Sequence, residues 1–178
     1  MGNNRHRNTI ALKQITPPTP RNNPDRLHAL KKLALLDTAT EVVYDDLTRM
    51  LAKAFDVPIV MVNLLDADRD WFKSCIGVSL KDSPVETSFC EFFFHCDDDF
   101  LVIPDTTADA RFADHPLVVN SPFIRFYASA RLAFDGHTVG TLCIYDLKAK
   151  QVSAEQLEIL SALRLAAMET LALRARPA

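Results

Sequence analysis

The stretch RFYASARLAFDGHTVGTLCIYD, residues 125–146, decides the fold. It predicts two strands joined by a tight turn at Asp135-Gly136, because a two-residue type I′ turn needs positive φ at both central positions and this dipeptide tolerates it. The first arm carries the small residues Ala128, Ser129 and Ala130 between aromatic residues. Small side chains leave room on a sheet face for either a packed helix or a ligand, and this arm alone does not decide between them.

Segments before the hairpin predict the rest of the sheet. The run VPIVMVNLL (57–65) is short and rich in β-branched residues, so it predicts a central strand, with residues 70–75 as its partner and 101–103 as a further short strand. Between them, SFCEFFFH (88–95) predicts a short helix, because Ser88 and Glu91 match a capping box. Pro84 is expected to exclude regular structure from its loop, and Pro116 to break a helical turn at 111–113.

Amphipathic helices are predicted on both sides of the sheet-forming segments. Apolar residues at helical spacing indicate helices over 25–36 and 41–55, and a capping box at Ser153 begins a long helix that runs to about residue 173. Because consecutive strands are local neighbours, the sheet should be mainly antiparallel, with the helices packed against it. The fold class is therefore α+β.

Length and composition set the domain organisation. The 178 residues are expected to form one domain over 25–174, after a basic, proline-rich and disordered tail over 1–24 and before a short tail over 175–178. The net charge of −3 gives no overall field that would attract nucleic acid. Apolar runs are too short for a membrane span, and the N-terminus does not match a secretory signal. A cytoplasmic protein with four free cysteines is the simplest reading.

Seven segments in order resemble one known family, the GAF domains of the group found ahead of sensor kinases and diguanylate cyclases in bacterial signalling. The segments, the last of which opens the final helix, cover nearly all of residues 26–172: RLHALKKLALLDT (26–38), YDDLTRMLAKAFDVPIVMVNLLDADRDWFKSCIG (44–77), ETSFC (86–90), LVIPDTTADARFADHPLV (101–118), IRFYASARL (124–132), GHTVGTLCIYD (136–146) and SAEQLEIL (153–160). The chain departs from the family pattern where Phe92 replaces a common His, Arg131 a common Pro, and Ala39 and Thr40 a common Pro pair.

The resemblance implies a central antiparallel sheet of about six strands, with the terminal helices on one face and a ligand pocket on the other. It favours a pocket wall along the first arm of the hairpin. It also implies a non-catalytic sensor that binds a small molecule, forms a homodimer through its terminal helices and takes part in signal transduction. Because the residues after 173 do not read as a kinase, cyclase or DNA-binding module, we expect the chain either to act through a separate output protein or to be one piece of a larger pathway. Neither the residues nor the resemblance names a cofactor.

Seven residues are candidate ligand contacts, and each has a structural alternative. The best single candidate for an anionic ligand is Arg125, although an ion pair with Asp105 or Asp109 is equally expected of it. Cys90, near a helix start, could be a thiol sensor, but a small buried apolar residue is the commoner case. Asp105 could instead cap a turn, and aromatic residues are more often core. The full set is Trp71, Cys90, Asp105, Arg111, Arg125, Tyr127 and Arg131.

No catalytic constellation is evident from the sequence. Serines lack a signalled histidine and acid partner, so a hydrolase is not expected. Cys90 and Cys96 are six residues apart, which is not the spacing of zinc ligands, so no metal site is predicted. The alternative to a sensor is a thiol-based enzyme or redox sensor that uses Cys90 and Cys96, similar to the GAF proteins that reduce free methionine sulfoxide.

Overall fold

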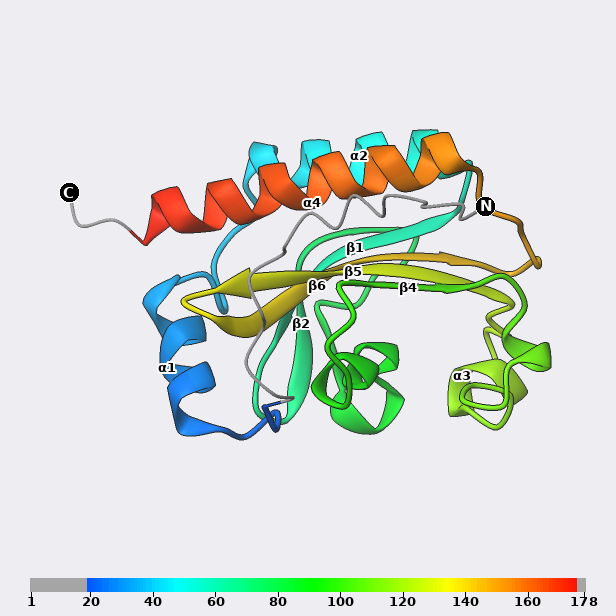
Figure 1. The fold of residues 1–178 in the computed structure, drawn as a ribbon, viewed down its shortest axis with the longest axis horizontal. Helices are drawn as coiled ribbons and strands as arrows, with labels where there is room; N and C mark the ends of the chain where they lie inside the picture. The colour runs from blue at the N-terminus through cyan, green and yellow to red at the C-terminus, as the bar shows by residue number, and fades with distance from the viewer. Residues whose placement is uncertain (1–18, 176–178) are drawn as a thin grey trace, which may run out of the picture.

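An antiparallel sheet of six strands forms the centre of the computed structural model, which describes residues 19–175. The strands lie in the order β3-β2-β1-β6-β5-β4, so that β1, β6 and β5 are central (Figure 1). Their bounds are Ile59–Leu65 (β1), Arg69–Ile76 (β2), Asp82–Pro84 (β3), Phe100–Ile103 (β4), Phe126–Phe134 (β5) and His137–Asp146 (β6). The α+β class and the antiparallel six-stranded sheet are confirmed.

The predicted hairpin is formed by β5 and β6. Asp135 and Gly136 have φ of 52° and 76°, the left-handed region that the two-residue turn requires. Neighbouring β1 lies close to β6 at Gly140, where an added Cβ would be 2.3 Å from the carbonyl oxygen of Asn63. The glycine therefore permits the close approach that brings Asn63 into the middle of the sheet.

Two long helices cover one face of the sheet (Figure 1). They are α2, Val42–Phe55, and α4, Ala154–Arg174. Ala128 and Ala130 of β5 belong to the core on this face, together with Leu160 of α4. The small residues of the first arm thus make room for a helix, and the expectation that they form a pocket wall is wrong for both alanines.

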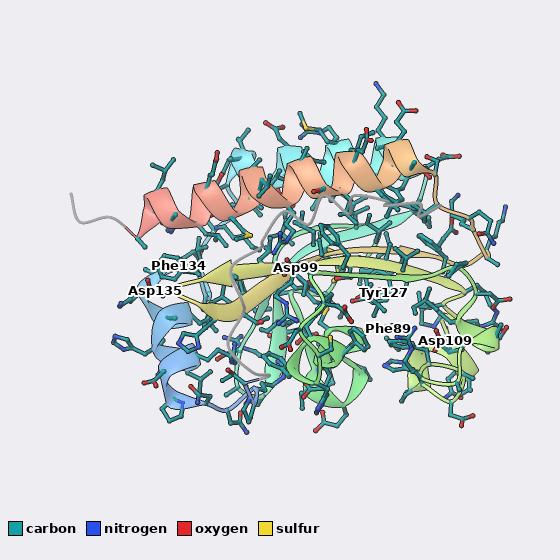
Figure 2. All side chains as sticks on the ribbon, in the orientation of Figure 1. Phe89, Asp99, Asp109, Tyr127, Phe134 and Asp135 are labelled. Carbon is teal, nitrogen blue, oxygen red and sulfur yellow. The ribbon has the colours of Figure 1, made fainter. Side chains whose placement is uncertain are left out.

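The opposite face carries short helices and loops. These are η1, Val85–Thr87, η2, Phe89–Phe94, η3, Thr106–Ala108, and α3, Pro116–Val119. Figure 2 shows Tyr127 extending from the sheet towards Phe89 of η2, and their ring centroids are 4.9 Å apart. This second core contains the buried cysteines Cys90 and Cys143 together with a cluster of aromatic side chains.

The folded part begins earlier than predicted. Helix α1, Pro24–Lys32, starts after Asn23, whose side chain accepts hydrogen bonds from two backbone amides of the first turn, and it ends four residues before the predicted limit. Arg21 was assigned to a disordered tail, yet it is only 5% exposed. The remainder of that predicted tail, residues 1–18, and most of the C-terminal one lie outside the described residues.

Three local predictions need correction and one is confirmed. Ser88 does not cap η2, because its hydroxyl is bonded to Asp70 instead. Pro116 begins α3, a position where its missing amide donor costs nothing. Pro84 ends the edge strand β3, where the ladder tolerates it. The capping box of Ser153 is present and begins α4.

Candidate ligand cavity

A cavity of about 150 Å³ lies between the sheet and the loops on its second face. Its floor is formed by β1 and β6, and its rim includes the exposed residues Leu80 and Pro122. The lining is largely apolar, with few polar side chains. The complete lining is Ile59, Met61, Asn63, Asp70, Phe72, Val78, Leu80, Ser83, Thr87, Leu117, Pro122, Ile124 and Tyr145.

Asn63 is the polar residue at the floor of the cavity. It is 1% exposed in the centre of β1. Its side-chain nitrogen donates to the sulfurs of Cys90, at 3.6 Å, and Cys143, at 3.4 Å. Within residues 19–175 its side-chain oxygen has no hydrogen-bond partner. A buried acceptor without a donor is costly, so this oxygen marks a place where a bound molecule could donate.

A buried ion pair involves Asp70, which lines the cavity, and Arg21. The guanidinium of Arg21 lies 2.9 Å from the carboxylate of Asp70 and also donates to the main-chain oxygen of Asp66 at 2.8 Å. Ser88 donates to the other oxygen of the same carboxylate. Burial raises the pKa of Asp70, and the nearby Arg21 charge and these hydrogen bonds only partly counter it. The network attaches the residues just before α1 to β2 and η2.

Aromatic rings pack behind the cavity. The ring of Phe89 lies 4.1 Å from that of His115, centroid to centroid, and 5.5 Å from that of Tyr145, which lines the cavity. Nδ1 of His115 accepts a hydrogen bond from the amide of Leu117, and burial lowers the pKa of this imidazole. A neutral histidine is required for that bond, since a protonated Nδ1 cannot accept.

Two of the seven predicted residues lie on the cavity face of the sheet near Asn63. Tyr127 is fully buried among aromatic rings, and its hydroxyl lies 3.4 Å from the sulfur of Cys90. Cys90 is also fully buried, and burial raises its thiol pKa. Neither residue lines the cavity itself. Asn63 therefore lines the cavity, whereas Cys90 and Tyr127 do not contact the space that a ligand would occupy.

Three predicted residues lie away from the cavity. Trp71 points to the opposite face of β2, where it belongs to the core under α2 and α4. Asp105 caps η3 by accepting from Thr107, and these hydrogen bonds lower its carboxyl pKa. Arg111 is exposed and pairs with Asp109 at 2.7 Å. Asp105 and Arg111 therefore have local structural roles. For Asp105 this is the turn-capping alternative given by the sequence.

The two remaining arginines stabilise carbonyl groups. Arg125 donates to the main-chain oxygens of Val118 and Ile124, and no ion pair joins it to Asp105 or Asp109 within the part of the chain that the structure describes. Arg131 points to the cavity face of the sheet, but its side chain is buried, with 2% exposure. Its guanidinium donates hydrogen bonds to three main-chain oxygens, that of Phe93 within η2 and those of Cys96 and Asp98 just after it. The donors of Arg131 are occupied, so this cation is not free to orient an anionic ligand, whereas Arg125 is half-buried and uses only Nη1 in its hydrogen bonds within residues 19–175.

Sequence reasoning missed the residues that build the site: Asn63, Asp70, Arg21 and Cys143. The one available signal was Asn63, the single polar residue in an otherwise apolar central strand. Its burial there requires partners that only the folded chain supplies.

Residues 19–175 contain neither a cluster of metal-binding side chains nor a membrane-spanning helix. Nowhere in this range do three or more His, Cys, Asp or Glu side chains gather as metal ligands would. Its helices are also too short or too polar to cross a membrane.

Comparison with known proteins identifies the family. The model of the GAF domain matches residues 39–171. A cyclic di-GMP phosphodiesterase of Pseudomonas aeruginosa is 34% identical over 142 residues, which is 79% of this chain but only 24% of that protein.

Solved structures agree on the fold. The GAF domain of an Acinetobacter phosphoenolpyruvate-protein phosphotransferase superposes with a TM-score of 0.59 at 14% identity, covering 84% of this chain and 94% of that one. A free methionine-R-sulfoxide reductase of Neisseria meningitidis gives a TM-score of 0.53 at 21% identity, with 80% and 89% covered. The family match, with the six-stranded sheet and its two faces, shows that this chain belongs to the GAF domain family and is of the signalling type.

Proposed function

We propose that the chain is a non-catalytic GAF sensor that binds a small molecule in the cavity beside Asn63. The observation that carries this proposal is an apolar cavity whose floor holds a buried acceptor without a donor, the side-chain oxygen of Asn63. A molecule with an apolar body and one N–H or O–H group would satisfy that oxygen and fill the space. Signalling relatives support the role, because the chain is similar to part of a cyclic di-GMP phosphodiesterase.

The size of the cavity limits the ligand. A volume of about 150 Å³ is similar to that of an apolar protein cavity that holds benzene. It is smaller than the roughly 300 Å³ at which pockets for drug-sized ligands begin. The proposed ligand is therefore a small metabolite with an amine, amide or hydroxyl group, and a cyclic dinucleotide is too large for this cavity.

Thermal unfolding with a panel of small amines, amides and alcohols tests this proposal. A ligand that binds only the folded chain raises the melting temperature in a concentration-dependent way. We expect the rise in the wild type and its loss in Asn63→Leu, which removes the acceptor. Val62→Ala is the matched control, because Val62 is buried on the opposite face of the same strand. Equal shifts in all three proteins, or none with any compound, would refute ligand recognition by Asn63.

A non-catalytic sensor is preferred to a thiol-based enzyme that uses Cys90 and Cys96. No hydrogen bond joins Cys90 to Cys96 in the described residues, and the carbonyl of Cys96 is held by Arg131 beyond the end of η2. An assay of free methionine sulfoxide reduction with a thiol reductant is expected to give no turnover; turnover lost in Cys96→Ser would overturn this assignment. The free cysteines are in keeping with a reducing, cytoplasmic location.

A homodimer through α2 and α4 would complete the sensor. Exposed apolar side chains lie on both helices, Val43 and Met50 on α2 and Leu165 and Leu173 on α4, with Met50 56% and Leu165 55% exposed. Helix α1 contributes none of the exposed large apolar residues found between residues 19 and 175. The pair of terminal helices expected from the sequence is therefore replaced by α2 and α4 in this proposal. A second copy would bury these side chains, and the dimer would pass ligand binding to a separate output protein.

Sedimentation equilibrium tests the dimer. We expect a dimer for the wild type and a monomer for the double variant Met50→Glu and Leu165→Glu. Phe123→Glu, another exposed apolar residue but on the far face, should leave the dimer intact. A wild-type monomer at high concentration would contradict the proposal.

A further inference from the structure

Two free cysteines meet under the floor of the cavity. The sulfurs of Cys90, on η2, and Cys143, on β6, are 3.1 Å apart, although 53 residues separate them in the sequence. Both side chains are fully buried. A disulfide bond is about 2.05 Å long, so the sulfurs need to approach by only about 1 Å to become linked.

Polar groups converge on both sulfurs: Thr141, Tyr127 and Asn63 lie within hydrogen-bonding distance of each, and Ser129 adds a contact to Cys143. The sulfur of Cys143 lies within hydrogen-bonding distance of four donors besides Cys90: the Thr141 hydroxyl at 3.0 Å, the Ser129 hydroxyl at 3.4 Å, the Asn63 amide at 3.4 Å and the Tyr127 hydroxyl at 3.6 Å. A cysteine that serves only as a small apolar side chain needs no such surroundings. Burial raises the pKa of Cys143, but hydrogen bonds from Cys90 first, and then from Ser129, Thr141 and Tyr127, outweigh burial and lower the pKa, because they stabilise the thiolate.

We propose that Cys90 and Cys143 are a redox-active dithiol pair, which a hydroperoxide oxidises to a disulfide and a cellular dithiol reduces again. The Cys143 thiolate attacks the terminal peroxide oxygen, an S–O bond forms, the O–O bond breaks, and the leaving alkoxide or hydroxide takes a proton. The sulfur of Cys90 then attacks the sulfenic acid; the S–S bond forms, the S–O bond breaks, and the departing hydroxide takes the Cys90 proton as water. Two thiols and one peroxide thus give one disulfide, one water and one alcohol, or two waters from hydrogen peroxide.

The cavity offers the oxidant a route. Asn63 lines the cavity and contacts both sulfurs, while the rim residues Leu80 and Pro122 are exposed. Hydrogen peroxide is little larger than water, so a displacement of the Asn63 side chain would admit it to Cys143. Because the same amide donates to both sulfurs, disulfide formation also changes the contacts of the residue at the cavity floor. Oxidation of the pair stands apart from ligand binding, since it requires no occupant in the cavity.

Peptide mapping of the double variant Cys75→Ser and Cys96→Ser tests the pair, because this variant retains only Cys90 and Cys143. The folded protein is treated with hydrogen peroxide, quenched with catalase, alkylated in denaturant and digested. We expect a linked peptide that contains Cys90 and Cys143 and that disappears after dithiothreitol. Recovery of both cysteines as alkylated thiols, or only as sulfinic or sulfonic acids, would overturn the proposal, as would a linked peptide that forms only in denaturant.

The order of attack has its own test. In Cys90→Ser the sulfenic acid at Cys143 has no thiol to resolve it, so dimedone is expected to label Cys143 after peroxide treatment. In Cys143→Ser we expect no label on Cys90. A label on Cys90 but none on Cys143 would overturn the assignment of Cys143 as the attacking thiolate. The unsubstituted protein gives the same linked peptide if either variant folds poorly.

Discussion

Replacement of Arg21 by Met tests whether the residues just before α1 are part of the folded domain. In the structure this guanidinium is 5% exposed, lies 2.9 Å from Asp70 and 2.8 Å from Glu91, and donates to the main-chain oxygen of Asp66. The substitution keeps much of the apolar volume but leaves the carboxylate of Asp70, 3% exposed, without its cation. Removal of one partner of a buried ion pair costs about 3–5 kcal/mol. For a chain of this size that corresponds to a melting temperature lower by about 6–20 °C.

The penalty should depend on pH. Burial in the folded state raises the pKa of the Asp70 carboxyl, so protonation of this carboxyl at low pH stabilises the folded state. Loss of the Arg21 charge raises this pKa further. A protonated Asp70 needs no cation. The difference in unfolding free energy between Arg21→Met and wild type should therefore be largest at neutral pH and shrink as the pH falls, because the folded carboxyl of Asp70 has a higher pKa without Arg21 than with it, while the unfolded carboxyl is the same in both proteins.

Urea unfolding at a series of pH values measures this difference. The matched control is Lys32→Met, because Lys32 and Asp135 also lie 2.8 Å apart but their side chains are about half exposed. An exposed pair contributes at most about 1 kcal/mol. If Arg21→Met cost no more than Lys32→Met, or if its penalty stayed the same from neutral to acid pH, the burial of Arg21 and its pairing with Asp70 would be refuted.

Three further predictions concern single positions. Gly140→Ala should destabilise by about 3 kcal/mol or more in urea, because its Cβ would meet the carbonyl of Asn63 at 2.3 Å; unchanged stability would contradict the close strand approach. Ser153→Ala should cost about 1 kcal/mol by removing the capping box of α4, and Ser153→Asp should restore most of it. Folding lowers the pKa of His115 from 6.5, so wild-type stability should fall as the pH drops through 6.5. His115→Asn, which keeps a cap acceptor for Leu117, should show a smaller fall; an identical pH profile would exclude this histidine as the cause.

Local sequence signals predicted most of the fold. The Asp135-Gly136 turn, the apolar spacing of α2 and the capping box of Ser153 act within a few residues, so each is readable without a tertiary structure. The same local view failed at Ser88, where the capping pattern is present but a buried carboxylate, Asp70, takes the hydroxyl. It failed also at Arg21, because a basic residue between prolines gives no sign that it will be buried.

The candidate site was less predictable because its contacts are distant in sequence. Cys90 was selected with Cys96, its neighbour in the chain, whereas the fold places Cys90 of η2 against Cys143 on strand β6. Arg131 was expected as a cation for a ligand, yet carbonyl groups around the end of η2 use its donors. Asn63 was overlooked since a single polar residue in an apolar strand has no spacing pattern. Pairings across a sheet depend on register, which composition and periodicity do not fix.

The central claim, that the cavity is a small-molecule site built around Asn63, is tested most directly by methyl NMR. The methyl groups of Met61, Ile59 and Ile124 line the cavity, whereas those of Leu160 lie in the core on the other face of the sheet. We predict that at least one small amine, amide or alcohol shifts the cavity methyls in the wild type, leaves Leu160 unchanged, and has no effect in Asn63→Leu. Cavity methyls that do not respond to any compound of this class, or that respond equally in Asn63→Leu, would contradict the claim.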